Sequence, residues 1–229
     1  MSSKLKIIIG SISFIIILLI MFPTIKRFIE IDNNGNWDDE YVKCDTILIN
    51  QETLIGCHNS QTNYYVINEK KDTVYQHDEW VYSAKFIDFN NDGYDDILFG
   101  YMSNTPEAFD LALYNPNDKN FKLVKDFPKF PSPTEIDKTG IYYSYHKSGC
   151  ADWDWDSDLF ILKDFEVVKL GNIHGIGCET SNKNTGIFIS KVKGTHYQLI
   201  DSILREPGYY DEKFGFIKSY WNSNHKKFE

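Results

Sequence analysis

The chain has 229 residues, with 24 Lys and Arg against 33 Asp and Glu, and 16% of its residues are aromatic. That aromatic content excludes an intrinsically disordered or collagen-like chain. All acidic side chains lie at Glu30 or later and four basic ones precede it, so the formal net charge of −9 divides into a basic N-terminus and a body of −13. Because so acidic a body repels phosphate backbones, we expect no nucleic-acid partner.

The N-terminus carries an uncharged, mostly apolar run at residues 7–22, with basic residues on both sides. A helix extended to residue 25 approaches the ~30 Å needed to cross a bilayer. We therefore predict a signal anchor over 1–28 with a transmembrane helix at 7–25, a polar stalk at 29–40 and an extracytoplasmic domain at 41–229. A cleaved signal peptide and a buried core helix are the alternatives.

Four cysteines, Cys44, Cys57, Cys150 and Cys178, occur without zinc-like spacing. If Asn50 and Gln51 form a two-residue hairpin turn, Cys44 lies directly opposite Cys57, and a bridge there would stabilise the fold by about 3 kcal/mol. Cys150 and Cys178 then pair by elimination. Four free buried thiols are the alternative. With the export signal, disulfides indicate a single-pass cell-membrane protein whose body faces the periplasm or another extracytoplasmic space.

The body shows little helix and many short runs rich in Tyr, Ile, Val, Phe and Thr, separated by polar turns. The predicted strands are 64–67, 73–75, 81–87, 97–101, 111–114, 121–124, 141–145, 159–162, 166–170, 186–192, 197–203 and 214–220. This spacing predicts an all-β domain, as a sandwich, a barrel or a propeller. The proline-rich stretch 127–133 is expected to be an extended crossover within one domain.

One loop between two predicted strands has oxygen-bearing side chains at alternate positions and a glycine at its sixth position. The expected ligands are the side chains of Asp88, Asn90, Asp92 and Asp96 and the carbonyl oxygen of Tyr94. Oxygen ligands in a tight loop are typical of Ca²⁺ sites. The loop is no EF-hand, because strand-like segments flank it and its twelfth position is Phe99. An ordinary Asn-Asp-Gly turn without an ion is the alternative.

With its strand flanks and its ending Asp96-Ile97-Leu98-Phe99-Gly100, this segment resembles the FG-GAP and VCBS calcium repeats of β-propeller blades, over residues 84–100. A looser resemblance over residues 60–205, through 111–121 and 142–153, is to secreted, calcium-binding proteins with an incomplete propeller. Some of that group are immunity proteins that inhibit peptidoglycan hydrolases. The resemblance implies a protein-binding role, with bound Ca²⁺ and a hydrolase as partner.

Four aspartates, Asp152, Asp154, Asp156 and Asp158, alternate with Trp153, Trp155 and Ser157. We expect a charged, solvated loop whose tryptophans pack into the core beside Cys150. Carbohydrate stacking on the tryptophans, and hence an adhesion or carbohydrate-binding module, is one alternative, and a glycan hydrolase using these carboxylates is another. Four similar carboxylates lack the pKa asymmetry of a glycosidase pair, and no catalytic motif occurs, so we do not expect an enzyme.

Two segments are candidate partner-binding loops. The glycine-rich stretch 171–178 contains His174 and ends at Cys178, which could hold a protruding loop in a fixed shape. The segment 206–211 offers Tyr209 and Tyr210 as exposed aromatics, a residue class enriched at binding hot spots. Plain connecting loops are the alternative for both segments.

Overall fold

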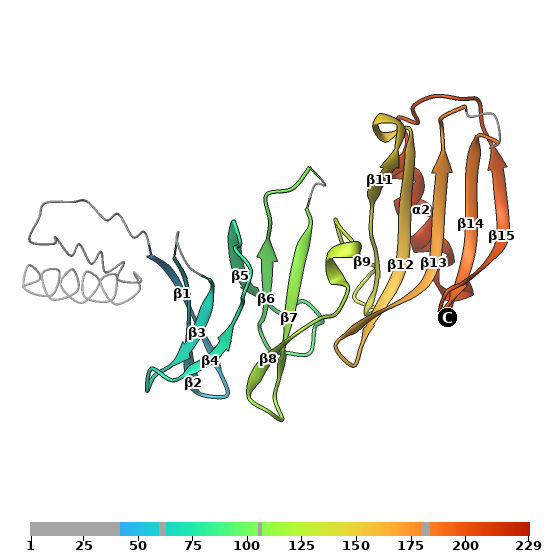
Figure 1. The fold of residues 1–229 in the computed structure, drawn as a ribbon. Coiled ribbons are helices and arrows are strands. Elements are labelled where there is room, and N and C mark those ends of the chain that lie inside the picture. The colour runs from blue at the N-terminus through green and yellow to red at the C-terminus, as the bar shows by residue number, and fades with distance from the viewer. Residues whose placement is uncertain (1–41, 60–62, 105–106, 180–183) are drawn as a thin grey trace, which may run out of the picture. The chain divides into compact units, whose positions relative to one another are not determined.

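The fold is that of a computed structural model, which describes residues 42–59, 63–104, 107–179 and 184–229. These residues form three antiparallel sheets, and the sheets are coloured in chain order in Figure 1. None of the sheets closes on itself, since each has two edge strands. The all-β prediction is therefore confirmed in outline.

The first sheet contains four strands in chain order, β1 (Val42–Ile49), β2 (Glu52–Asn59), β3 (Tyr65–Asn68) and β4 (Thr73–Gln76). Asn50 and Gln51 both adopt positive φ, 51° and 67°, as the two central residues of a tight hairpin turn do. Cys44 lies opposite Cys57 in the register, and the two are joined by a disulfide with Cα atoms 4.1 Å apart. The predicted turn, register and bridge are thus confirmed.

The second sheet also has four strands in chain order, β5 (Ser83–Ile87), β6 (Asp96–Gly100), β7 (Phe109–Asn115) and β8 (Asn120–Leu123). All five residues of β6 are buried, because both faces of this sheet are covered. Ile97 and Phe99 belong to an apolar cluster shared with the first sheet. Leu98, which points the other way, belongs to a cluster shared with the third sheet.

The third sheet has seven strands, in the order β15-β14-β13-β12-β10-β9, with β11 also paired to β12. A 3₁₀ turn, η1 (Phe127–Lys129), lies in the proline-rich stretch before it, and η2 (Cys150–Asp152) precedes β12. The strands are β9 (Thr134–Glu135), β10 (Ile141–Tyr143), β11 (His146–Gly149), β12 (Asp154–Lys163), β13 (Glu166–Ile176), β14 (Gly186–Lys193) and β15 (His196–Leu204).

A helix, α2 (Lys213–Asn224), lies against one face of the third sheet and continues into the 3₁₀ turn η3 (His225–Lys227) (Figure 1). The prediction of a strand at 214–220 is therefore wrong. Lys213, Ile217 and Trp221 are buried at intervals of four residues, which is the period of one helix face. Every other predicted run overlaps a strand.

The core of the third sheet packs between its strands and α2. Trp155 and Ile173 face Trp221, whose indole nitrogen donates a buried hydrogen bond of 2.8 Å to Ser157 Oγ. Gly175 lies in β13 against the indole ring of Trp155, where a Cβ atom would overlap that ring. Gly171 and Gly175 therefore give room for packed aromatic rings. The expectation of a protruding loop over the whole stretch 171–178 is wrong, because residues up to Ile176 form β13.

In the part of the chain that the structure describes, no helix is long and apolar enough to cross a membrane. The predicted anchor at 7–25 and the stalk at 29–40 lie outside the described residues.

Candidate calcium loop and partner-binding surface

The predicted calcium loop connects β5 to β6. The carboxylate of Asp88 accepts hydrogen bonds from the backbone nitrogens of Asp92 (3.0 Å) and Gly93 (3.1 Å). Asn90 Oδ1 accepts from the nitrogen of Asp92 at 3.2 Å, and Asp92 Oδ1 accepts from the nitrogen of Tyr94 at 2.9 Å. Gly93 has φ of +90°, so the glycine at the sixth position supplies a conformation that other residues rarely adopt.

Asp96, the last expected ligand, begins β6 and is fully buried. Its two oxygens accept hydrogen bonds from the backbone nitrogens of Phe89 (3.0 Å) and Tyr114 (2.9 Å). Burial raises the pKa of Asp96 to about 7, although these amide hydrogen bonds oppose the shift. None of the basic side chains in the described residues forms an ion pair with this carboxyl, so its charge would be stabilised by a nearby cation.

The chemistry of this loop fits Ca²⁺, because its donors are oxygen atoms and it contains a buried carboxylate with no basic partner. As the side chains are placed, however, no three His, Cys, Asp or Glu side chains among the described residues converge on one point as metal ligands do. Asp88 and Asp92 instead accept hydrogen bonds from the loop's own amides. The expected ligands lie in one loop, but their acidic side chains do not converge on one point. Calcium binding therefore stays a prediction.

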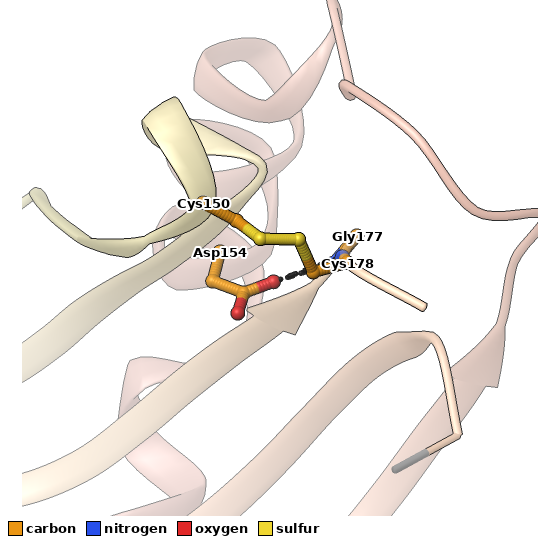
Figure 2. The surroundings of a disulfide bond; sticks show 4 residues. All are labelled: Cys150, Asp154, Gly177 and Cys178. Carbon is orange, nitrogen blue, oxygen red and sulfur yellow. Dashed lines mark hydrogen bonds between the residues drawn. A yellow bond between two sulfur atoms is a disulfide. The ribbon is translucent and has the colours of Figure 1, made fainter. Parts of the chain in front are cut away.

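The second disulfide joins Cys150 in η2 to Cys178, just beyond β13, with Cα atoms 6.2 Å apart (Figure 2). Asp154 Oδ1 accepts hydrogen bonds from the backbone nitrogens of Gly177 and Cys178, both at 3.0 Å. The nitrogen of Gly208 donates to the carbonyl oxygen of Gly177 at 2.8 Å. The pairing predicted by elimination is thus present, and it ties three segments together at one end of the third sheet.

The row of aspartates is not the solvated loop that we expected, because residues 154–158 form the start of β12. Trp155 is buried as expected, but Trp153 is 41% exposed. The carboxylate of Asp158 is only 3% exposed. The sequence pattern failed here because it does not show which strands lie on either side of this segment.

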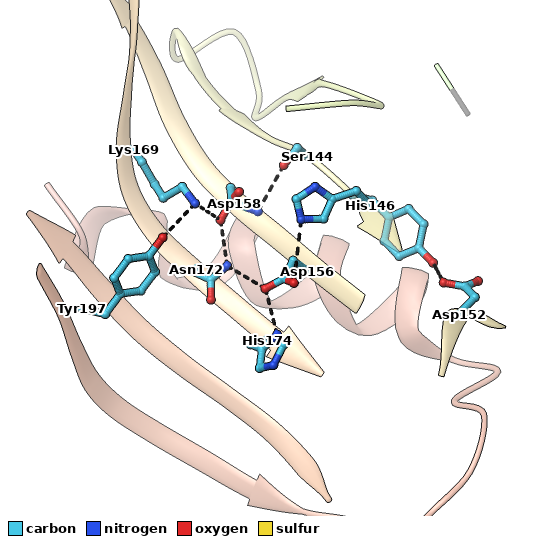
Figure 3. A network of polar contacts seen from close by, with 10 residues as sticks. Ser144, His146, Asp152, Asp156, Asp158, Lys169, Asn172, His174 and Tyr197 are labelled. Carbon is cyan, nitrogen blue, oxygen red and sulfur yellow. Dashed lines mark hydrogen bonds and ion pairs between the residues drawn. The ribbon is translucent and has the colours of Figure 1, made fainter. Parts of the chain in front are cut away.

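The half-buried Asp156 and the buried Asp158 belong to a polar network across β11, β12 and β13 (Figure 3). Asp156 lies 2.9 Å from His174 Nδ1 and 3.1 Å from Asn172 Nδ2, and His146 Nε2 is 3.8 Å away. Burial alone would raise the pKa of Asp156, but the hydrogen bond and charge of His174, together with hydrogen bonds from Asn172 and Ser148, bring the pKa below its usual value. Asp156 is therefore ionised and fully engaged at neutral pH.

Asp158 is held by the same network. Lys169 Nζ lies 2.9 Å from Asp158 Oδ1 and 3.0 Å from the hydroxyl of Tyr197, and Asn172 Nδ2 donates to Asp158 Oδ1 at 2.7 Å. Burial lowers the pKa of Lys169, but the charge and hydrogen bond of Asp158 outweigh it, so the net shift is upward. An ammonium group directly on the carboxylate is unfavourable for a general acid.

The expected partner-binding residues differ in their surroundings. His174 lies in β13 with its side chain about one-third exposed and bonded to Asp156, so it belongs to the polar network. Tyr209 is 46% exposed, as expected. Tyr210 is only half-exposed, because it packs against the helix core and the Arg205 guanidinium lies 3.8 Å from the centre of its ring.

Lys213, which we did not predict to be a site residue, lies against the ring of Tyr209. Its side chain is fully buried, and its Nζ atom lies 2.7 Å from Asp152 Oδ2 and 3.0 Å from the Asp152 carbonyl oxygen. The same Nζ lies 4.2 Å from the ring centre of Tyr209 and 5.6 Å from that of Phe214. From the sequence alone, a lysine among aromatic residues is expected at the surface. Its burial follows from its position at the start of α2.

No known protein family matches the chain, and no curated protein matches it. Among solved structures, the chain is similar to that of a Xanthomonas type IV secretion system related protein, at 11% sequence identity and a TM-score of 0.43. The match covers 72% of this chain and 96% of that chain. At this TM-score the similarity defines neither the fold nor the function.

Proposed function

We propose that this chain is a membrane-anchored, extracytoplasmic protein-binding module that is stabilised by Ca²⁺ and inhibits a peptidoglycan hydrolase. The observation that carries the proposal is the pairing of all four cysteines in two disulfides. Disulfides persist in oxidising compartments, and peptidoglycan hydrolases act outside the cytoplasm. The resemblance of residues 60–205 to secreted immunity proteins supplies the kind of partner.

The succession of sheets supports a propeller-like arrangement. The first two sheets each consist of four antiparallel strands in chain order, as propeller blades do. The candidate calcium loop connects β5 to β6 of the second sheet, and strands on both sides of such a loop support the FG-GAP and VCBS resemblance. Asp88, Asn90, Asp92, the Tyr94 carbonyl and Asp96 would hold the ion, which would supply positive charge beside the buried carboxylate of Asp96.

The hydrogen bonds and ion pairs of the aspartates favour a binding role over a catalytic role. Asp156 and Asp158 are each held by two or more hydrogen-bonding or cationic neighbours. A glycosidase needs one carboxyl with a raised pKa beside an ionised partner, whereas the pKa of Asp156 is lowered.

A binding assay tests this function. The full chain, purified in mild detergent with 5 mM CaCl₂, would be immobilised and exposed to purified peptidoglycan hydrolases of several cleavage types, including a c-type lysozyme, a lytic transglycosylase and an amidase. We expect saturable binding of at least one hydrolase. Failure of every hydrolase to bind would overturn the proposal, and binding of free glycan fragments instead would favour the carbohydrate-binding alternative.

A further inference from the structure

Three exposed aromatic residues lie on segments that meet at the disulfide end of the third sheet. Trp153, Tyr209 and Phe214 are 41%, 46% and 53% exposed, and we call them the aromatic patch. The segments that carry them are in contact, because Gly177 lies against the backbone of both Trp153 and Gly208. Trp and Tyr are the residues most enriched at binding hot spots, so this end of the sheet has the composition of an interface.

Two rings of the aromatic patch, those of Tyr209 and Phe214, pack against neighbouring side chains. Lys213 Nζ contacts the rings of Tyr209 and Phe214 and is neutralised by Asp152. The Tyr145 ring lies 4.6 Å from that of Phe214, and its hydroxyl donates to Asp152. A surface that is ordered before binding loses less conformational entropy when a partner binds.

The charges around the aromatic patch indicate the kind of partner. Three exposed acidic residues flank Tyr209 and Phe214 in the chain, a fourth follows Cys178, and the exposed basic side chain of Arg205 stacks on Tyr210. These acidic residues are Glu179, Glu206, Asp211 and Glu212. Lys213, which lies against the patch, is buried and paired with Asp152, so it adds no exposed positive charge. Exposed carboxylates on the segments that carry apolar rings are complementary to a cationic protein surface.

We infer that the aromatic patch is the docking surface for the cationic face of a peptidoglycan hydrolase. This inference rests on the proposed function and adds to it the surface, the contact residues and the charge of the partner. Trp153, Tyr209 and Phe214 would form the buried centre of the interface, and the acidic residues its polar rim. The partner's lysines and arginines would face that rim, so that association becomes faster as the salt concentration falls.

Alanine variants test the docking surface against the hydrolase that binds in the assay above. We expect Trp153→Ala and Tyr209→Ala each to weaken the dissociation constant by about tenfold or more, as hot-spot residues do. Trp80→Ala and Tyr82→Ala are matched controls, because these aromatics are 50% and 64% exposed and lie outside the third sheet. We expect each control to change the dissociation constant less than twofold. Thermal unfolding of each variant would check that it folds.

A charge-reversal variant gives an independent test. Glu206→Lys combined with Asp211→Lys leaves the aromatic rings in place and should slow association severalfold at low salt, with a smaller effect at high salt. The docking surface is wrong if a hydrolase binds with an affinity and an association rate that these changes do not alter. It is also wrong if only the Trp80 and Tyr82 variants weaken binding. In both cases the proposed function stands. If no hydrolase binds, both are overturned.

Discussion

Lys213 Nζ lies 2.7 Å from Asp152 Oδ2, and the lysine side chain is completely buried. This ion pair joins the start of α2 to the residue that follows Cys150 and Ala151. Removal of one partner from a buried pair leaves the other charge uncompensated, so we expect Lys213→Met to destabilise the fold by about 3 kcal/mol. Urea unfolding at neutral pH measures the change.

Lys218→Met is the matched control for that substitution, since Lys218 lies on the exposed side of the same helix. The control should alter the free energy of unfolding by less than about 0.5 kcal/mol. Equal effects of the two substitutions would contradict a stabilising role for the ion pair.

The network around Asp156 predicts a pH-dependent contribution to stability. Because its pKa is lower in the folded chain than in the unfolded chain, the stabilisation is present above the unfolded pKa of about 3.9 and is lost as the pH falls through the lower folded value. We expect Asp156→Asn to destabilise the fold by about 1–3 kcal/mol at pH 7 and by less at pH 3. Unfolding curves of both proteins at the two pH values provide the comparison. The same difference at both would show that ionisation of Asp156 does not matter.

Substitution of Gly175 is expected to disturb the packing of β13 against Trp155. A Cβ atom there would overlap the buried indole of Trp155, so Gly175→Ala should destabilise the fold by about 1–3 kcal/mol. Gly215→Ala is the control, because no atom lies within 4 Å of the added Cβ and the position is within α2. It should stabilise the helix by about 0.5–1 kcal/mol. Thermal melts would reveal opposite signs, and shifts of the same sign would contradict this packing.

Calcium should raise the melting temperature of the full chain. If the loop binds with a dissociation constant of about 10⁻⁴ M, 10 mM Ca²⁺ adds about 2.7 kcal/mol of stability. That corresponds to about 5 °C or more for a domain of this size. Asp88→Ala and Asp92→Ala should abolish the response, whereas Asp95→Ala, an acidic residue outside the ligand pattern, should keep it. If calcium does not change the melting temperature of the wild type, the loop is an ordinary turn that binds no ion.

Local features of this fold were predictable from the sequence. A two-residue turn relates every position of a hairpin to one partner, and the pairing of Cys44 with Cys57 follows from Asn50 and Gln51. The helix α2 was not predictable in this way, because its aromatic residues favour strands and one of its buried positions is a lysine.

The surroundings of the aspartates were not predictable from the sequence either. His146, Asp156 and His174 become neighbours only when β11, β12 and β13 pair across 28 residues of chain. The same holds for Trp153 and Tyr209, whose segments meet through Gly177 and Gly208. A pattern of residue types along one segment carries no information about such pairings.

The most direct test of the proposed function is the initial rate at which a bound hydrolase degrades purified peptidoglycan, measured while the full chain is titrated in with calcium present. An inhibitor that docks tightly should reduce the rate in proportion to the amount added, until little activity is left near one equivalent. An unchanged rate at a tenfold excess of the chain would contradict inhibition.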